Sequence, residues 1–210
     1  MFVALASGSF VAGGLAAQLA RRYGSRPVVI AGMATEAVGL LATIPLLAPA
    51  ASGWALAAPL FVYGMGVGLA TAQLTNAILV DVPLEASGQA SGIQSTFRQV
   101  GSALGIAVLG TLLVVGLATR TASGLESIPG LPAEAQQGIT TAVRGSAGAV
   151  LPAFREQPGT AAVVAVVEDA FVTSARIVAA TAAGFILAGM VAAIRLPGGR
   201  RRPLSDPGEG

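Results

Sequence analysis

A single acidic residue interrupts the second apolar run of the sequence, where its type and depth could support proton chemistry. Glu36 is nine residues beyond Pro27, which places it about 14 Å along a helix. Helical spacing puts it on a stripe of small or polar residues with Gly32, Gly39 and Thr43. A carboxyl group at this depth could take up and release a proton. The alternative is a protonated carboxyl that only hydrogen-bonds a neighbour.

The third apolar run carries amide and hydroxyl side chains that could form hydrogen bonds. Gln73 and Asn76 are spaced to lie side by side on a helix, with Thr71 and Thr75 nearby. One interpretation is contact with water or a polar ligand. The other is a hydrogen bond between neighbouring helices, which contributes about 0.6 kcal/mol in a bilayer.

The fourth apolar run begins with a polar, glycine-rich stretch at residues 87–110. Gln94, Arg98, Gly101 and Gly105 recur at i, i+4, i+7 and i+11, so they share one helix face. The Gly101-x-x-x-Gly105 spacing removes side chains from that face and predicts close packing against another helix.

Arg98 lies one to two turns inside this apolar run and must find a partner or reach the lipid headgroups. Asp81 and Glu85, just before the run, are the candidate partners. The alternative is an arginine side chain that extends to lipid phosphates.

The composition shows what kind of elements must position these residues. Hydrophobic residues make up 54% of the 210-residue chain, charged residues make up 10%, and the mean hydropathy is +0.76. Such a chain belongs in a lipid bilayer. The sequence has no cysteine and no histidine, which excludes thiolate or imidazole metal sites and histidine acid–base chemistry.

Several other function classes can also be set aside. All twelve basic residues are arginines scattered between apolar runs, and no basic stripe with aromatic residues suggests nucleic-acid binding. A phosphate-binding loop lacks its lysine, and the serines lack a histidine to activate them. We therefore predict a protein that is not an enzyme and needs no metal or organic cofactor.

Five apolar windows are long enough to cross about 30 Å of hydrocarbon. A signal peptide is not favoured at the start, because the arginines follow the first apolar run instead of preceding it. The predicted spans are 2–19, 27–47, 54–80, 93–118 and 170–194.

Residues 119–169 are predicted to form a long external loop with short helices, because Gly, Pro and charged residues interrupt each apolar run. A weak amphipathic helix is expected from about Pro132. The segment 161–167 is either a helix packed on the membrane face or an extension of the fifth span.

The distribution of arginine predicts the orientation in the membrane. Arginines collect in the loop 21–26, near residue 98 and in the tail 195–210, which are therefore expected on the cytoplasmic side, with the N-terminus external.

Two sequence motifs resemble those of a known family. DVPLEASGQASGIQSTFRQVGSALGIAVLGT, residues 81–111, resembles the hallmark of the fourteen-helix drug/proton antiporter branch of the major facilitator superfamily. GLAAQLARRYGSRPVVIAG, residues 14–32, resembles the superfamily's cytoplasmic loop motif, with Arg22, Gly24 and Arg26 in register. Arg21 replaces the usual aspartate, which puts the charge relay of that motif in doubt.

The resemblance implies an all-α membrane fold that forms part of the C-terminal six-helix unit of a major facilitator transporter. It implies proton-coupled efflux of amphiphilic drug-like molecules across the plasma membrane. Such transporters bind substrate between two halves, so the chain alone is expected to be inactive. The implied partners are the lipid bilayer, an N-terminal transporter half, a small-molecule substrate and protons. The alternative is a non-transporting membrane subunit or a truncated remnant.

The resemblance also suggests roles for individual residues. It makes the third span a cavity-lining helix, so that Thr71, Gln73, Thr75 and Asn76 become substrate candidates, and Glu36 is the candidate for proton coupling. Against this role, the second span here corresponds to a peripheral helix of the half. The cytoplasmic gate would comprise Arg22, Gly24, Arg26, Asp81, Glu85, Gln94 and Arg98.

Overall fold

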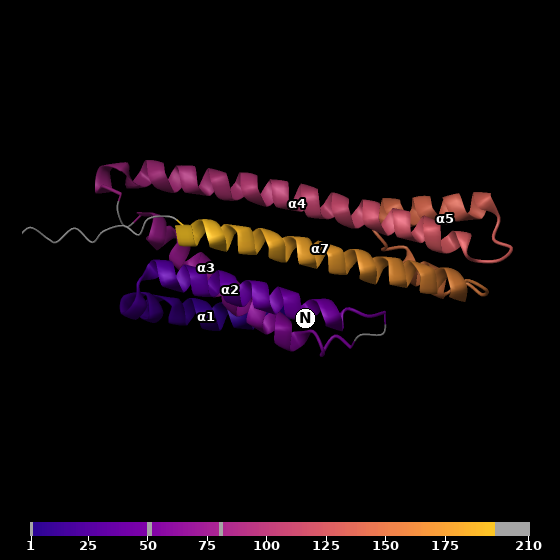
Figure 1. Ribbon diagram of the computed structural model, residues 1–210, viewed down its shortest axis with the longest axis horizontal. Coiled ribbons are helices and arrows are strands. Elements are labelled where there is room, and N and C mark those ends of the chain that lie inside the picture. The colour runs from indigo at the N-terminus through magenta and orange to yellow at the C-terminus, as the bar shows by residue number, and fades with distance from the viewer. Residues whose placement is uncertain (1, 50–51, 80–81, 196–210) are drawn as a thin grey trace, which may run out of the picture.

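The computed structural model describes residues 2–49, 52–79 and 82–195, and within them the regular secondary structure is entirely helical (Figure 1). The helices are α1 (Phe2–Tyr23), α2 (Ser25–Thr43), η1 (Ile44–Leu46), α3 (Ala57–Leu79), η2 (Leu84–Ala86), α4 (Ser87–Glu126), α5 (Ala133–Ser146), α6 (Leu151–Arg155) and α7 (Ala161–Arg195). Five of these helices, α1, α2 continued by η1, α3, α4 and α7, are long and apolar enough to cross a membrane. The predicted all-α membrane fold is confirmed.

The last two long helices extend well past the spans predicted within them. Helix α4 has 40 residues and α7 has 35, about twice the 20 residues that a bilayer requires. Residues 119–126 were predicted to lie in a loop, and they instead form the end of α4. The segment 161–167 forms the start of α7, which is the second of its two predicted alternatives, an extension of the fifth span.

Helices α1, α2 and α3 pack through glycines, which let their backbones approach closely. Helix α3 presents alternate faces: Gly64 and Gly68 contact α1, while Gly66 contacts α2. A Cβ added at Gly66 would lie 2.6 Å from both the Glu36 Cα and the Gly32 carbonyl oxygen. Since lipid gives no hydrophobic drive for helix pairing, this close backbone contact is what holds such helices together.

A tight turn joins α1 to α2. Gly24 connects the two helices with φ of 91°, a conformation that residues with a side chain rarely adopt. Next to the turn, the Arg22 guanidinium lies 5.4 Å from the centre of the Tyr23 ring.

Helix α7 is attached to α2 by one arginine near each end of the pair. Arg26, near the start of α2, donates hydrogen bonds to the carbonyls of Ala193 (3.1 Å) and Ile194 (2.8 Å) in the last turn of α7. Arg176, within α7, donates to the carbonyl of Leu47, just after η1. The 17 residues from Arg176 to Ala193 span about 26 Å, close to the thickness of the hydrocarbon layer.

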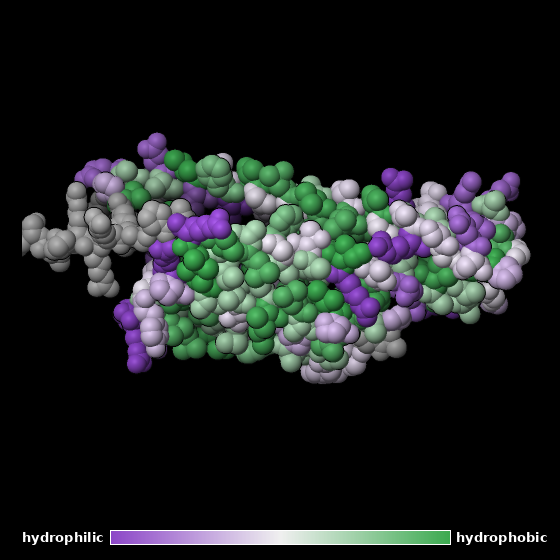
Figure 2. All heavy atoms as spheres, in the orientation of Figure 1, coloured by the Kyte–Doolittle hydropathy of each residue, from purple (hydrophilic) through white to green (hydrophobic). Residues whose placement is uncertain are grey.

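The remaining parts of α4 and α7 project beyond α1–α3, together with α5 and α6 (Figure 1). Fifteen residues of α7 precede Arg176, which corresponds to about 22 Å of helix. This projection has its own apolar core, formed by Leu117, Leu125, Val143, Val163, Val167 and Ala170. Figure 2 shows a broad hydrophobic surface over the middle of the molecule and hydrophilic residues gathered toward its ends.

Candidate functional site

A polar cavity of about 190 Å³ lies between α3 and the start of α4. Its walls bring together several of the residues singled out in the sequence. The lining residues are Thr71, Leu74, Thr75, Ser91, Gln94, Ser95 and Arg98. The structure thus places two predicted substrate residues, Thr71 and Thr75, next to two predicted gate residues, Gln94 and Arg98.

One hydrogen bond joins the two helices that line the cavity. The Gln94 side-chain amide donates to the Thr75 hydroxyl at 3.1 Å. Ser91 and Ser95, which the sequence analysis did not single out, add two hydroxyl groups. Their spacing from Arg98, at i, i+4 and i+7 along one helix face, is the signal that could have identified them.

Arg98 supplies the cation of this cavity. Its side chain is exposed, and among the described residues no carboxylate lies within 4.0 Å of its guanidinium. The predicted pairing with Glu85 is therefore absent in this structure, and the other predicted partner, Asp81, lies outside the described residues. The guanidinium is always charged and has five N–H donors.

Gln73 and Asn76 form a separate cluster instead of lining the cavity. Gln73 is 3% exposed, and its side-chain oxygen accepts hydrogen bonds from the Ser25 hydroxyl (3.3 Å) and the Asn76 amide (3.4 Å). The bond from Ser25 joins α2 to α3, so Gln73 makes the interhelical contact that the sequence left as one of two alternatives.

Glu36 lies in the contact between α2 and α3, half-buried. Its carboxyl group faces the side chain of Tyr63 on α3. The backbone of Gly66 packs directly against the backbone of Glu36. Sequence spacing could not identify Tyr63 as the partner, because the pairing depends on how α2 and α3 meet.

The glycines of the fourth run do not pack as predicted within this chain. No described atom lies within 4 Å of a Cβ added at Gly101 or Gly105. Helix α4 instead meets α7 farther along, where Gly116 faces Ser174 and Gly124 faces Val166. The earlier part of α4 is widely exposed and carries apolar side chains such as Phe97 (74%), Leu104 (61%) and Ile106 (72%).

The remaining predicted gate residues have structural contacts of their own. Gly24 forms the turn between α1 and α2, and Arg22 lies over the Tyr23 ring beside it. Arg26 contacts the end of α7, and Glu85 is exposed in η2. Arg26 lies with the cavity toward the same end of the bundle, because α3 ends and α4 begins there (Figure 1).

Comparisons with known proteins place these helices in a family. The family model described as Major Facilitator Superfamily matches residues 1–106, a range that contains the cavity and Glu36. The multidrug resistance protein Stp of Mycobacterium tuberculosis is 35% identical over 112 residues, which cover 53% of this chain and 20% of that protein. The multidrug efflux pump LfrA of Mycolicibacterium smegmatis is 31% identical over 104 residues, covering 50% and 20%.

A probable actinorhodin transporter of Streptomyces coelicolor is 30% identical over 113 residues, covering 52% of this chain and 19% of the relative. The matched segment thus spans about a fifth of the length of each of these relatives. No solved structure matches the chain significantly. From the family match over half of its length, we conclude that this multi-pass membrane chain belongs to the Major Facilitator Superfamily.

Proposed function

We propose that this chain supplies one part of a proton-coupled transporter that exports amphiphilic, drug-like molecules across the plasma membrane. The observation that carries the proposal is the polar cavity between α3 and α4, next to the exposed apolar side chains of α4. A polar pocket beside an apolar surface suits a ligand that has both characters. The names of two relatives, a multidrug resistance protein and a multidrug efflux pump, support the same direction of transport.

The proposed substrate site needs a second wall from other membrane helices. The cavity within this chain holds about 190 Å³, whereas pockets for small molecules usually hold about 300–1,000 Å³. Transporters of this kind bind substrate between two halves that rock against each other. We therefore propose an N-terminal half as partner, with Gly101 and Gly105 on the α4 face that it would cover.

Glu36 is the proposed proton-coupling residue. It is the only carboxyl group that the described structure places between the levels of Arg26 and Arg176. A carboxyl group in this layer can change its charge as it gains or loses a proton, and its interaction with Tyr63 would change with it. The proposed orientation has Arg26 and residues 195–210 on the cytoplasmic side and the projection outside.

Co-expression with the whole part of a full-length relative that precedes the matched segment tests the proposal. Cells that contain both parts should export a fluorescent amphiphilic dye, and a protonophore should stop the export. Glu36→Gln should abolish the dependence of dye export on the proton gradient. The matched control, Glu134→Gln on α5, should leave this dependence unchanged. Arg98→Ala and Gln94→Ala should each weaken dye affinity about tenfold, because each removes a hydrogen-bonding side chain from the cavity. Gln99→Ala, a control outside the cavity lining, should leave dye affinity unchanged.

The outcomes separate the function from the site. Unchanged export in Glu36→Gln, Arg98→Ala and Gln94→Ala would reject the assigned residues. No export above the level of either part alone, with both parts present in the membrane, would instead favour a non-transporting subunit.

A further inference from the structure

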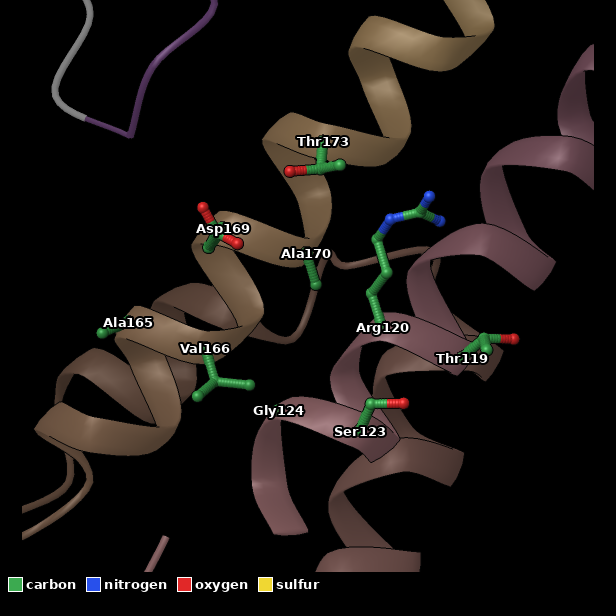
Figure 3. A pocket seen from close by; sticks show the side chains of 9 residues that line it. All are labelled: Thr119, Arg120, Ser123, Gly124, Ala165, Val166, Asp169, Ala170 and Thr173. Carbon is green, nitrogen blue, oxygen red and sulfur yellow. The ribbon is translucent and has the colours of Figure 1, made fainter. Parts of the chain in front are cut away.

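A second cavity, of about 670 Å³, lies between α4 and α7 where the projection begins (Figure 3). Arg120 extends from α4 into the space between the helices, and Asp169 stands on the α7 side. Small and apolar residues of α7, among them Val166 and Ala170, fill the wall between them. The cavity therefore combines one cation, one anion and an apolar surface. The transport site proposed above does not use it.

The Arg120 side chain is held between the helices without a charged partner. Its Nη1 donates a long hydrogen bond of 3.3 Å to the carbonyl of Gly116. A Cβ added at Gly116 would lie only 3.2 Å from Nη1 and 3.2 Å from the Ser174 hydroxyl oxygen. Glycine at this position therefore makes room for the guanidinium. Among the described residues no carboxylate lies within 4.0 Å of it.

A buried hydroxyl beside the guanidinium also lacks a partner. Ser174 is 1% exposed, and its oxygen has no hydrogen-bond partner in the described structure. Buried polar groups are rarely left unpaired, and each one calls for an explanation. Ser174 does not line the cavity itself, but Arg120 and the hydroxyl of Thr173 do, and a ligand with strong acceptor oxygens would complete the hydrogen bonds of the guanidinium.

The depth of the cavity indicates where this ligand comes from. Arg176, which contacts the end of α2 at Leu47, is two residues beyond Ser174 in α7, an axial step of about 3 Å. Because the Arg120 guanidinium lies beside Ser174, it is at a level just past the end of α2. The headgroup layer on each side of a bilayer is about 5–7 Å thick, so the guanidinium would lie within it where the Arg26 and Arg176 contacts mark the two surfaces of the hydrocarbon layer.

We propose that this cavity binds the headgroup of a phospholipid. The planar guanidinium of Arg120 matches the oxygens of a phosphate ester and can bind two of them at once. The carboxylate of Asp169, farther along α7 toward the projection, would pair with an amine, so that the site prefers an ethanolamine headgroup over an uncharged one. The acyl chains would follow the exposed apolar side chains of α4, such as Val108 and Val115.

Native mass spectrometry of the full chain in detergent tests this proposal. Phosphatidylethanolamine, phosphatidylglycerol and diacylglycerol are titrated separately, and the fraction of protein carrying lipid is measured. Wild type should retain both phospholipids, with phosphatidylethanolamine ahead. Arg120→Gln should weaken retention of both about tenfold, the factor expected for losing a hydrogen bond between charged groups.

Two further variants make the test specific. Asp169→Asn, an exposed position, should keep the phospholipids bound but remove the preference for ethanolamine. Arg144→Gln removes an exposed arginine of α5 that does not line the cavity and should bind as wild type does. Circular dichroism checks that each variant retains its helices.

Three results would overturn the proposal. Equal retention by Arg120→Gln and wild type would mean that Arg120 does not bind the headgroup. Equal retention of diacylglycerol would show that the phosphate is not recognised. Displacement of the lipid by millimolar inorganic phosphate would assign the cavity to a free anion instead of a lipid.

Discussion

Replacing Gly8 by alanine tests whether close backbone contact holds α1 against α3. A Cβ at Gly8 would collide with the Phe61 carbonyl oxygen and lie 3.0 Å from the Met65 amide nitrogen. Both are backbone atoms, so α1 and α3 must move apart to admit the methyl group. Overpacking of this kind costs about 1–3 kcal/mol.

Gly14→Ala is the matched control, because it lies in the same helix and an added Cβ meets nothing within 4 Å. Alanine favours a helix over glycine by about 0.8–1.0 kcal/mol at either position, so this contribution cancels in the comparison. Gly8→Ala should therefore be less stable than Gly14→Ala by about 1–3 kcal/mol. Equal stability of the two variants would refute the glycine-contact explanation of the α1–α3 packing.

The assay is reversible unfolding in mixed micelles with increasing sodium dodecyl sulphate, followed by circular dichroism. Trp54 is the only tryptophan and lies in the turn just before α3. Its side chain is 87% exposed but lines one cavity together with Val3 and Ala4 of α1, so its emission reports on the contact between α1 and the start of α3. A shift in the circular dichroism midpoint without a matching shift in Trp54 emission would place the damage outside this contact and would also contradict the reasoning.

Two further predictions concern the arginine contacts. Arg26→Ala removes the hydrogen bonds to the last turn of α7, so the amide hydrogens of residues 190–195 should exchange about tenfold faster. Arg195→Ala, an exposed control, should leave these exchange rates unchanged. Unaltered exchange in Arg26→Ala would show that the contact does not hold α7. Arg155→Ala breaks the ion pair with Glu168, but the Arg155 side chain is 53% exposed, so the free energy of unfolding should fall by less than about 1 kcal/mol. A loss that exceeds that of Arg144→Ala by more than about 1 kcal/mol, measured in the same unfolding assay, would contradict this weak contribution.

The five long helices could be predicted from sequence because apolar length is a local property. The end of α4 could not. The predicted span ended at residue 118, yet the helix continues to Glu126, since Leu125 joins an apolar core with Leu117 and with residues of α5 and α7. Hydropathy alone cannot tell where a helix leaves the bilayer and where it ends.

The glycines show a different reason for the limits of sequence analysis. Gly101 and Gly105 have the same spacing as Gly64 and Gly68, and both pairs match a packing motif. Within the described structure, however, only Gly64 and Gly68 contact another helix of this chain. Which glycine face is used depends on the position of neighbouring helices. Likewise, Arg26 and its α7 acceptors are more than 160 residues apart in sequence, so no local pattern predicts their contact.

The two walls of the α3–α4 cavity are held in different ways, and this difference bears on how a transporter could use it. Helix α3 is fixed on two sides by backbone contacts to α1 and α2. Helix α4 packs mainly on α7, through contacts near Gly116 and Gly124, about 27–39 Å along the helix from Arg98. A small tilt of α4 about this distant attachment would move Arg98 far more than Gly116. Among the described helices, α4 is therefore the cavity wall whose position other membrane helices can most readily change.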